Sequence, residues 1–109
     1  MELQTEIRNE IHIVILAGRV DVLLAPDLKA SLDELITRSK TFKHLCIDLS
    51  AVNFLDSTAM GVFINLHKTL RKSKKKFSLC APQPQVSKLF DLSGLSRFFT
   101  IFNSRDDVH

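Results

Sequence analysis

Hydrophobic and polar residues alternate at the start of the chain and then give way to a run that is almost entirely apolar. Leu3, Thr5 and Ile7 alternate with polar neighbours, which is typical of an edge strand with one face in water. Residues 11–17 are nearly all apolar and predict a strand covered on both faces. Because the intervening Asn9-Glu10 favours a tight turn, the two strands should form a hairpin.

After the hairpin, the spacing of apolar residues alternates between helical and extended periods. Pro26 suits the first turn of a helix, where no amide hydrogen is needed, and Leu28 and Leu32 begin the buried stripe of that helix. Gly94 is placed to end a later helix. Beyond a break at 18–21, the pattern predicts a helix from Ala25, a strand at 43–49, a loop at 50–55, a helix at 57–73, a strand at 77–81, a short helix after Pro82 and Pro84, a strand at 98–102 and the start of a helix after Ser104.

This order of elements predicts an α/β fold. Strands that alternate with helices after an opening hairpin favour a mixed, mostly parallel sheet of about four or five strands with helices packed on it. A length of 109 residues suits a single domain, so we expect one domain over residues 1–109. Loops at the carboxyl ends of neighbouring parallel strands lie together, so the loops at 18–25 and 50–57 are expected to form one surface.

Composition and charge narrow the class of protein. The chain is 45% hydrophobic and 25% charged, which is ordinary for a folded domain. Its net charge of +3 comes largely from the cluster at 71–76, which we interpret as solvated cations at a helix C-terminus rather than as a nucleic-acid site. No apolar run approaches the length that spans a bilayer, so we expect a cytoplasmic protein without a membrane partner, monomeric when free.

The cysteines and histidines offer little candidate chemistry. Cys46 and Cys80 each lie in an apolar run, where a free thiol behaves as a small buried hydrophobe, and neither has a partner at metal-ligand spacing. A hydrolase serine needs a Gly-x-Ser-x-Gly turn and a nearby base, but His67 lies about 15 Å from Ser57 along one predicted helix. We therefore expect no metal, no cofactor and no enzymatic activity.

The start of the helix at 57–73 carries a candidate regulatory site. Asp56 is a good N-cap, because its carboxylate can accept hydrogen bonds from first-turn amides, and Ser57 then occupies the first helical position. A phosphate on Ser57 would lie beside free N–H groups at the positive end of the helix dipole. It would therefore add a charge of about −1.5 to −2 without unfolding the helix. The alternative is that Asp56, Ser57 and Thr58 are only a cap and a first turn.

The same helix has apolar residues on more than one side. Such a distribution favours a helix that packs on the sheet with one side, while Met60 and Ile64 contribute to an exposed docking patch beside Ser57. The alternative is that a loop or the last helix covers these side chains.

Three segments carry a pattern that extends across the chain. They are Gly18-Arg19-Val20-Asp21, the stretch from Asp48-Leu49-Ser50 to Asp56-Ser57-Thr58-Ala59-Met60-Gly61, and Leu89-Phe90-Asp91-Leu92-Ser93-Gly94-Leu95. Together they make the chain resemble the STAS-domain anti-sigma-factor antagonists. These bacterial proteins free a sigma factor by capturing the anti-sigma factor that holds it.

The resemblance implies a function and a set of site residues. In that family the unphosphorylated antagonist binds an anti-sigma factor that is also a serine kinase, and phosphorylation of the serine that corresponds to Ser57 reverses the binding. A serine phosphatase acting on phosphorylated Ser57 would restore it. The resemblance assigns partner binding to Asp56 and Asp21, and we expect Val22, Leu23, Leu24, Thr58 and Met60 to extend the contact surface.

One residue departs from the family pattern. A glycine usually follows the second hydroxyl residue, but this chain has Ala59, whose methyl group favours the helix by about 1 kcal/mol and could crowd a kinase that approaches Ser57. Thr58 is an alternative phosphoacceptor. The competing hypothesis is a STAS scaffold without a switch, such as a subunit of a transport or signalling assembly.

Overall fold

The hairpin and the alternating elements assemble into one five-stranded sheet in the order β1-β2-β3-β4-β5. The computed structural model describes residues 1–39 and 41–109. β1 pairs with β2 antiparallel, and the remaining neighbours are parallel, which confirms the α/β prediction. The elements are β1 (Gln4–Arg8), β2 (Ile11–Val20), α1 (Ala25–Arg38), β3 (His44–Leu55), α2 (Ser57–Lys72), β4 (Lys76–Cys80), α3 (Pro84–Ser93), β5 (Thr100–Phe102) and a 3-10 turn, η1 (Arg105–Asp107).

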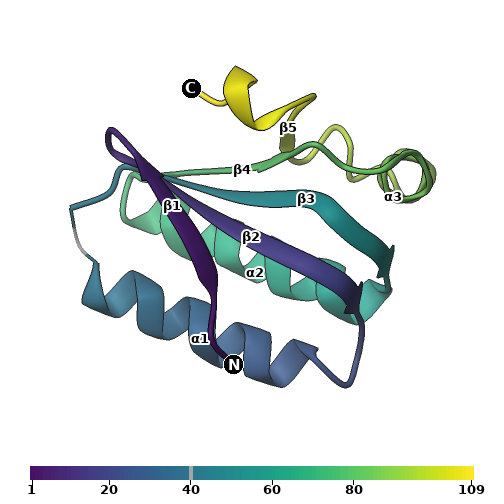
Figure 1. Cartoon of the computed structure of the whole chain (residues 1–109), viewed down its shortest axis with the longest axis horizontal. Helices are drawn as coiled ribbons and strands as arrows, with labels where there is room; N and C mark the ends of the chain where they lie inside the picture. The colour runs from purple at the N-terminus through teal and green to yellow at the C-terminus, as the bar shows by residue number, and fades with distance from the viewer. Residues whose placement is uncertain (40) are drawn as a thin grey trace.

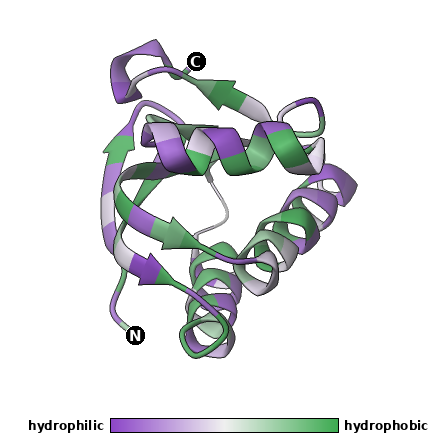
Figure 2. Ribbon diagram, turned by 90° about the vertical axis from the view of Figure 1, so that its right-hand side faces the viewer, coloured by the Kyte–Doolittle hydropathy of each residue, from purple (hydrophilic) through white to green (hydrophobic). Residues whose placement is uncertain are grey.

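The main hydrophobic core lies between the sheet and its helices. α1 and α2 run side by side beneath one face of the sheet, and α3 lies near the end of β3 (Figure 1). Side chains of β2 and β3 such as Val14 and Ile47 are fully buried there, against Leu28 of α1 and Phe63 of α2. Each helix in Figure 2 mixes hydrophobic and hydrophilic residues, as amphipathic elements in a layered fold must.

The opposite face of the sheet has a smaller core that the C-terminal residues help to cover. Cys46 and Cys80 are both free and buried there, as the sequence predicted. Asp48 is also buried on this face, and its carboxylate pairs with Arg105 of η1 at 2.7 Å. The chain beyond β5 is thus held to the centre of the sheet by an ion pair.

The structure corrects the prediction of a loop at 50–55 and of a break at 18–21. Residues 50–55 and 18–20 belong to the sheet, because β3 continues to Leu55 and β2 to Val20, and only Asp21 of the expected break lies outside a strand. The register shifts between Gly18 and Arg19, and an earlier shift lies near Ser50, whose amide donates to the Asp48 carboxylate at 2.8 Å. These β-bulges break the two-residue period, so a twisted strand end resembles a polar loop in the sequence.

The other elements follow the predicted order with small changes at their ends. The last strand is only Thr100–Phe102 rather than 98–102, because residues 95–99 form turns. Gly94 ends α3 with a φ of 79°, in the left-handed region that favours glycine. Among the described residues, no helix has the length and apolar character needed to cross a membrane.

Candidate functional site

Asp56 connects the two loops that the sequence placed on one surface. Its Oδ1 accepts a hydrogen bond from the Ala59 amide at 2.9 Å, which caps α2. Its Oδ2 accepts from the Val22 amide at 2.8 Å, in the segment before α1. The backbone adds a further bond, from the Asp56 amide to the Val20 carbonyl at 3.4 Å. A single carboxylate therefore fixes the start of α2 against the segment that leaves β2.

Asp21 organises that segment from within. Its Oδ1 accepts from the amides of Leu23 and Leu24, at 3.1 and 3.3 Å, so the residues before α1 form a tight turn. Its other carboxylate oxygen lies 3.6 Å from Nε of Arg19. The expectation that the loops at 18–25 and 50–57 form one surface is confirmed, since Val22, the neighbour of Asp21 in the chain, bonds to the Asp56 carboxylate.

Ser57 and Thr58 are the first residues of α2, and both are exposed. A helix offers no carbonyl partner for its first amides, and in α2 the Asp56 carboxylate accepts the Ala59 amide but neither the Ser57 nor the Thr58 amide among the bonds of the described residues, so these two N–H groups are available to an anion. Ala59 is fully buried in the main core. Its methyl group therefore points away from the surface, and the expected crowding of a partner by Ala59 is wrong.

Exposed apolar side chains adjoin the Ser57 end of α2. Val22 is 57% exposed and Leu23 is 85% exposed, although both are apolar. Phe54, at the end of β3, is also exposed, and the Arg19 guanidinium lies 4.0 Å from its ring centroid. The pair of Arg19 and Phe54 was not predicted from the sequence, because both residues were expected in loops. In the structure they are paired residues near the ends of β2 and β3.

The exposed docking contribution expected of Met60 is wrong. Met60 is only 7% exposed and packs in the main core, because the first turn of α2 turns this side chain toward the sheet. Ile64 is half-buried against the same core, as is Leu24. The accessible surface near Ser57 is therefore formed by Val22, Leu23 and Thr58 together with Arg19 and Phe54. We call this set the Ser57 surface.

Comparison with known proteins identifies the family. The family model described as the STAS domain matches residues 2–108, so the chain belongs to the STAS domain family. An "Anti-sigma-B factor antagonist" of Listeria monocytogenes is 32% identical over 103 residues, which cover 94% of this chain and 89% of the relative. An "Anti-sigma F factor antagonist" of Paenibacillus polymyxa is 28% identical over 106 residues, 95% of this chain and 90% of the relative.

Solved structures of related proteins share the fold. The anti-sigma factor antagonist of Mycobacterium paratuberculosis has a TM-score of 0.85 at 27% identity, covering 97% of this chain and 88% of that protein. The unphosphorylated form of the anti-sigma factor antagonist SpoIIAA has a TM-score of 0.80 at 20% identity, covering 97% and 91% of the two chains. Its phosphorylated form from Bacillus matches with a TM-score of 0.72, also at 20% identity, with 97% of this chain and 95% of that chain covered.

Proposed function

We propose that this protein is an anti-sigma-factor antagonist with a phosphorylation switch at Ser57. The unphosphorylated protein binds an anti-sigma factor in the bacterial cytoplasm, and the sigma factor is released. The anti-sigma factor is itself a serine kinase, and its transfer of phosphate to Ser57 ends the complex. A serine phosphatase returns the protein to the binding form. The protein acts in this scheme by binding and does not catalyse a reaction.

The position of Ser57 is the observation that carries this proposal. Its hydroxyl is exposed at the start of α2, and the Asp56 carboxylate holds the apolar Val22 and Leu23 beside that position. A kinase can therefore reach Ser57 while it binds the neighbouring apolar side chains. The names of the relatives from Listeria and Paenibacillus support the same role.

The free-energy balance explains why a phosphate would release a partner. The helix dipole stabilises a negative charge at the N-terminus of α2 by about 0.3–1 kcal/mol. Removing water from an uncompensated ion at an interface costs several kcal/mol. A net penalty of about 4 kcal/mol lowers affinity about a thousandfold, which is enough to switch a complex off. The Asp56 carboxylate adds repulsion, because it lies next to Ser57 in the chain.

Exposed apolar side chains near Ser57 supply the attraction in the unphosphorylated state. Burial of an exposed leucine or valine at an interface contributes about 1.5–3 kcal/mol. Leu23 is the most exposed of the large hydrophobic residues identified in the described chain, so it should contribute strongly to partner affinity. Leu92 is the matched control, because it is 77% exposed on α3 and lies outside the Ser57 surface.

The test is phosphorylation by the anti-sigma factor of the same organism with ATP, followed by mass spectrometry of the peptide that contains Ser57. The native protein and Thr58→Ala should each gain one phosphate, and Ser57→Ala should gain none. Leu23→Ala should weaken binding of the kinase, while Leu92→Ala should not. Phosphorylation of Ser57→Ala at an unchanged rate would contradict the proposal, as would a Leu92→Ala effect equal to that of Leu23→Ala. A protein that binds a partner without being phosphorylated would instead be a scaffold.

A further inference from the structure

The two cysteines of the chain lie together on the face of the sheet opposite α1 and α2. In the parallel pair of β3 and β4, Cys46 is opposite Ser78 and Asp48 is opposite Cys80. Cys46 and Cys80 are therefore diagonal neighbours, and they pack together in the smaller core with both side chains fully buried. Both are free thiols. The fold thus brings two reducing groups within reach of each other.

Hydrogen bonding makes the two thiols chemically unequal. The hydrogen bond with Cys80 lowers the pKa of Cys46, burial opposes this effect, and a hydrogen bond with Ser78 lowers the pKa further. The contact with Cys46, followed by burial, raises the pKa of Cys80. Because the thiolate is the nucleophilic form of cysteine, Cys46 is the candidate attacking group, and Cys80 remains a thiol beside it.

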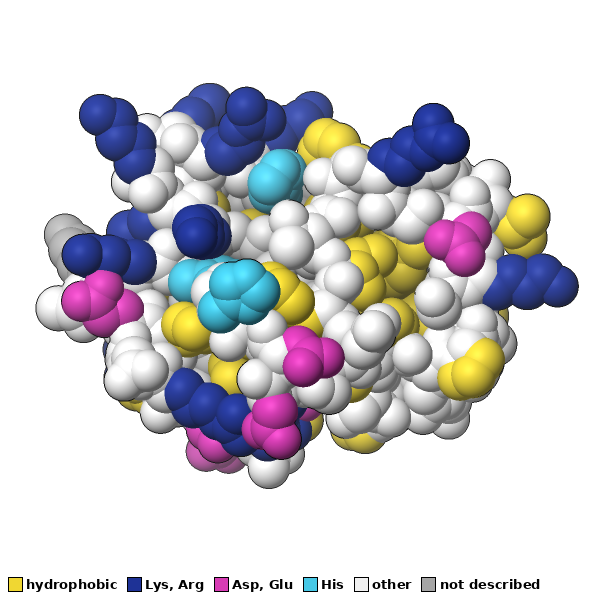
Figure 3. Space-filling view, turned by 90° about the horizontal axis from the view of Figure 1, so that it is seen from above, with side chains coloured by type: hydrophobic (Ala, Val, Ile, Leu, Met, Phe, Trp, Pro, Cys, Tyr) yellow, Lys and Arg dark blue, Asp and Glu magenta, His cyan; other side chains and the backbone are white. Residues whose placement is uncertain are grey.

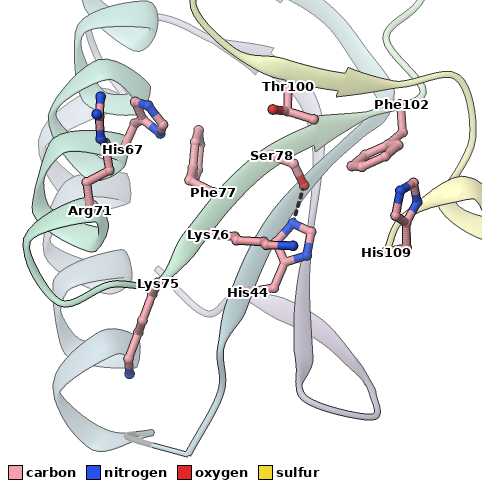
Figure 4. A pocket seen from close by; sticks show the side chains of 10 residues that line it. All are labelled: His44, His67, Arg71, Lys75, Lys76, Phe77, Ser78, Thr100, Phe102 and His109. Atoms are coloured by element: carbon pink, nitrogen blue, oxygen red, sulfur yellow. Dashed lines mark hydrogen bonds between the residues drawn. The ribbon is translucent and has the colours of Figure 1, made fainter.

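The C-terminal residues form a thin cover over the thiols. Phe102 of β5 and Val108 pack against the cysteine cluster, and neither is itself fully buried. Figure 4 shows Phe102 near His44 and Ser78, whose side chains project from the same face of β3 and β4 as the cysteines. Between Phe102 and Val108, η1 has no buried residue. Chain ends with few buried contacts open locally at low cost, so this cover can admit a small oxidant.

Ion pairs hold the cover to the sheet. Arg105 of η1 pairs with the buried Asp48 at 2.7 Å and with Glu6 of β1 at 2.8 Å. Asp106 pairs with Arg8 of β1 at 2.9 Å. Figure 3, which looks onto this side of the molecule, shows Lys or Arg side chains against Asp and Glu side chains at the surface. Loss of the Arg105 pairs should therefore open the cover more often.

We propose that Cys46 and Cys80 form a reversible disulfide when the protein is exposed to a peroxide. The Cys46 sulfur attacks one peroxide oxygen, the O–O bond breaks, and the products are a sulfenic acid on Cys46 and water. The Cys80 sulfur then attacks the Cys46 sulfur, the S–O bond breaks, and the Cys80 proton leaves with the hydroxide as a second water. The two thiols together lose two electrons, which reduce hydrogen peroxide to water. This modification does not depend on the proposed switch at Ser57.

The strand geometry makes this disulfide a labile one. Diagonal neighbours on paired strands have Cα atoms about 7–8 Å apart, whereas a disulfide usually joins Cα atoms that are up to about 6.8 Å apart. Formation of the bond therefore requires β3 and β4 to shift by about 1 Å, and the strained bond should be easy to reduce. A thiol reductant should thus restore both free cysteines.

The experiment is exposure of the full, folded chain to hydrogen peroxide, followed by mass spectrometry without reduction. We expect the loss of two hydrogen atoms, a cross-link between the peptides that contain Cys46 and Cys80, and full reversal by dithiothreitol. Dimedone, which traps sulfenic acids, should label Cys80→Ser at Cys46. It should label Cys46→Ser at Cys80 at least about ten times more slowly.

Two variants test whether the cover controls access to the thiols. Arg105→Met should speed disulfide formation at least about tenfold, because opening no longer breaks the ion pairs with Asp48 and Glu6. Asp56→Ala is the matched control, because it removes two hydrogen bonds at the Ser57 surface and leaves the cover intact. Its rate of disulfide formation should equal that of the native protein.

Several results would overturn the proposal. Thiols that react only after unfolding in urea would show that the cover does not open in the native state. Asp56→Ala that speeds oxidation as much as Arg105→Met would place access in global unfolding. Disulfides between chains, or sulfinic acid on Cys46 without a disulfide, would show that Cys80 does not react with the sulfenic acid. Equal dimedone labelling of the two serine variants would remove the assignment of Cys46 as the nucleophile.

Discussion

Removal of the Asp56 carboxylate should loosen the link between α2 and the segment before α1. Asp56→Ala loses the cap bond to the Ala59 amide and the bond to the Val22 amide. The cap contributes about 1 kcal/mol, and a hydrogen bond to a charged group in this half-exposed setting contributes about as much. The free energy of unfolding should therefore fall by about 2 kcal/mol.

Asp56→Asn separates the two contributions. The asparagine side-chain oxygen can still cap α2, but its NH₂ group cannot accept a hydrogen bond from the Val22 amide. We expect Asp56→Asn to cost about 1 kcal/mol, about half the effect of Asp56→Ala. Asp91→Asn is a suitable control, because Asp91 is exposed on α3 and away from this link.

The assays are urea unfolding and amide hydrogen exchange. In Asp56→Asn the Val22 amide should exchange faster, while the Ala59 amide keeps its protection; in Asp56→Ala both should exchange faster. An unchanged Val22 exchange rate in Asp56→Ala would contradict this role of Asp56, because the bond of 2.8 Å would then contribute nothing to holding the segment.

Three further predictions concern stability. Burial raises the pKa of Asp48, but hydrogen bonds from Ser50 and Arg105 outweigh it and hold the pKa below its ordinary value of 3.8, so this carboxylate stabilises the fold above that pH. Arg105→Met should therefore lower the free energy of unfolding by about 2–3 kcal/mol at pH 7. The difference in unfolding free energy between the variant and the native protein should shrink as the pH falls below 3.8. A difference that does not change with pH in urea titrations would contradict this prediction. Ala59→Gly should cost about 1 kcal/mol in the same assay without speeding phosphorylation, because the Ala59 methyl group is buried. Ser57→Asp should change the unfolding free energy by less than about 1 kcal/mol, and unfolding of this variant at room temperature would exclude a switch that preserves the fold.

The order of the elements could be predicted from the sequence, because each strand or helix has its own period of apolar residues. Pro26 and Gly94 marked helix ends correctly, since their constraints are local. The C-terminal ends of β2 and β3 could not be predicted in the same way. Their bulges near Gly18 and Ser50 follow from pairing between two strands, and pairing leaves no simple periodic signal in either one.

The candidate site shows the same division between local and tertiary information. The capping role of Asp56 follows from its position before a helix, and the structure confirms it. Its second bond, to Val22, depends on how β2 and β3 end beside each other and has no local signal. Met60 was misplaced because the apolar pattern of α2 does not say which sides the sheet covers.

The proposed switch is tested most directly by the affinity of the anti-sigma factor for this protein before and after enzymatic phosphorylation at Ser57, measured by calorimetry. A switch at Ser57 predicts tight binding of the unphosphorylated protein and a loss of affinity of about a thousandfold on phosphorylation, with the fold unchanged by circular dichroism. Equal affinities for the two forms would contradict the proposal that charge at the start of α2 controls the complex.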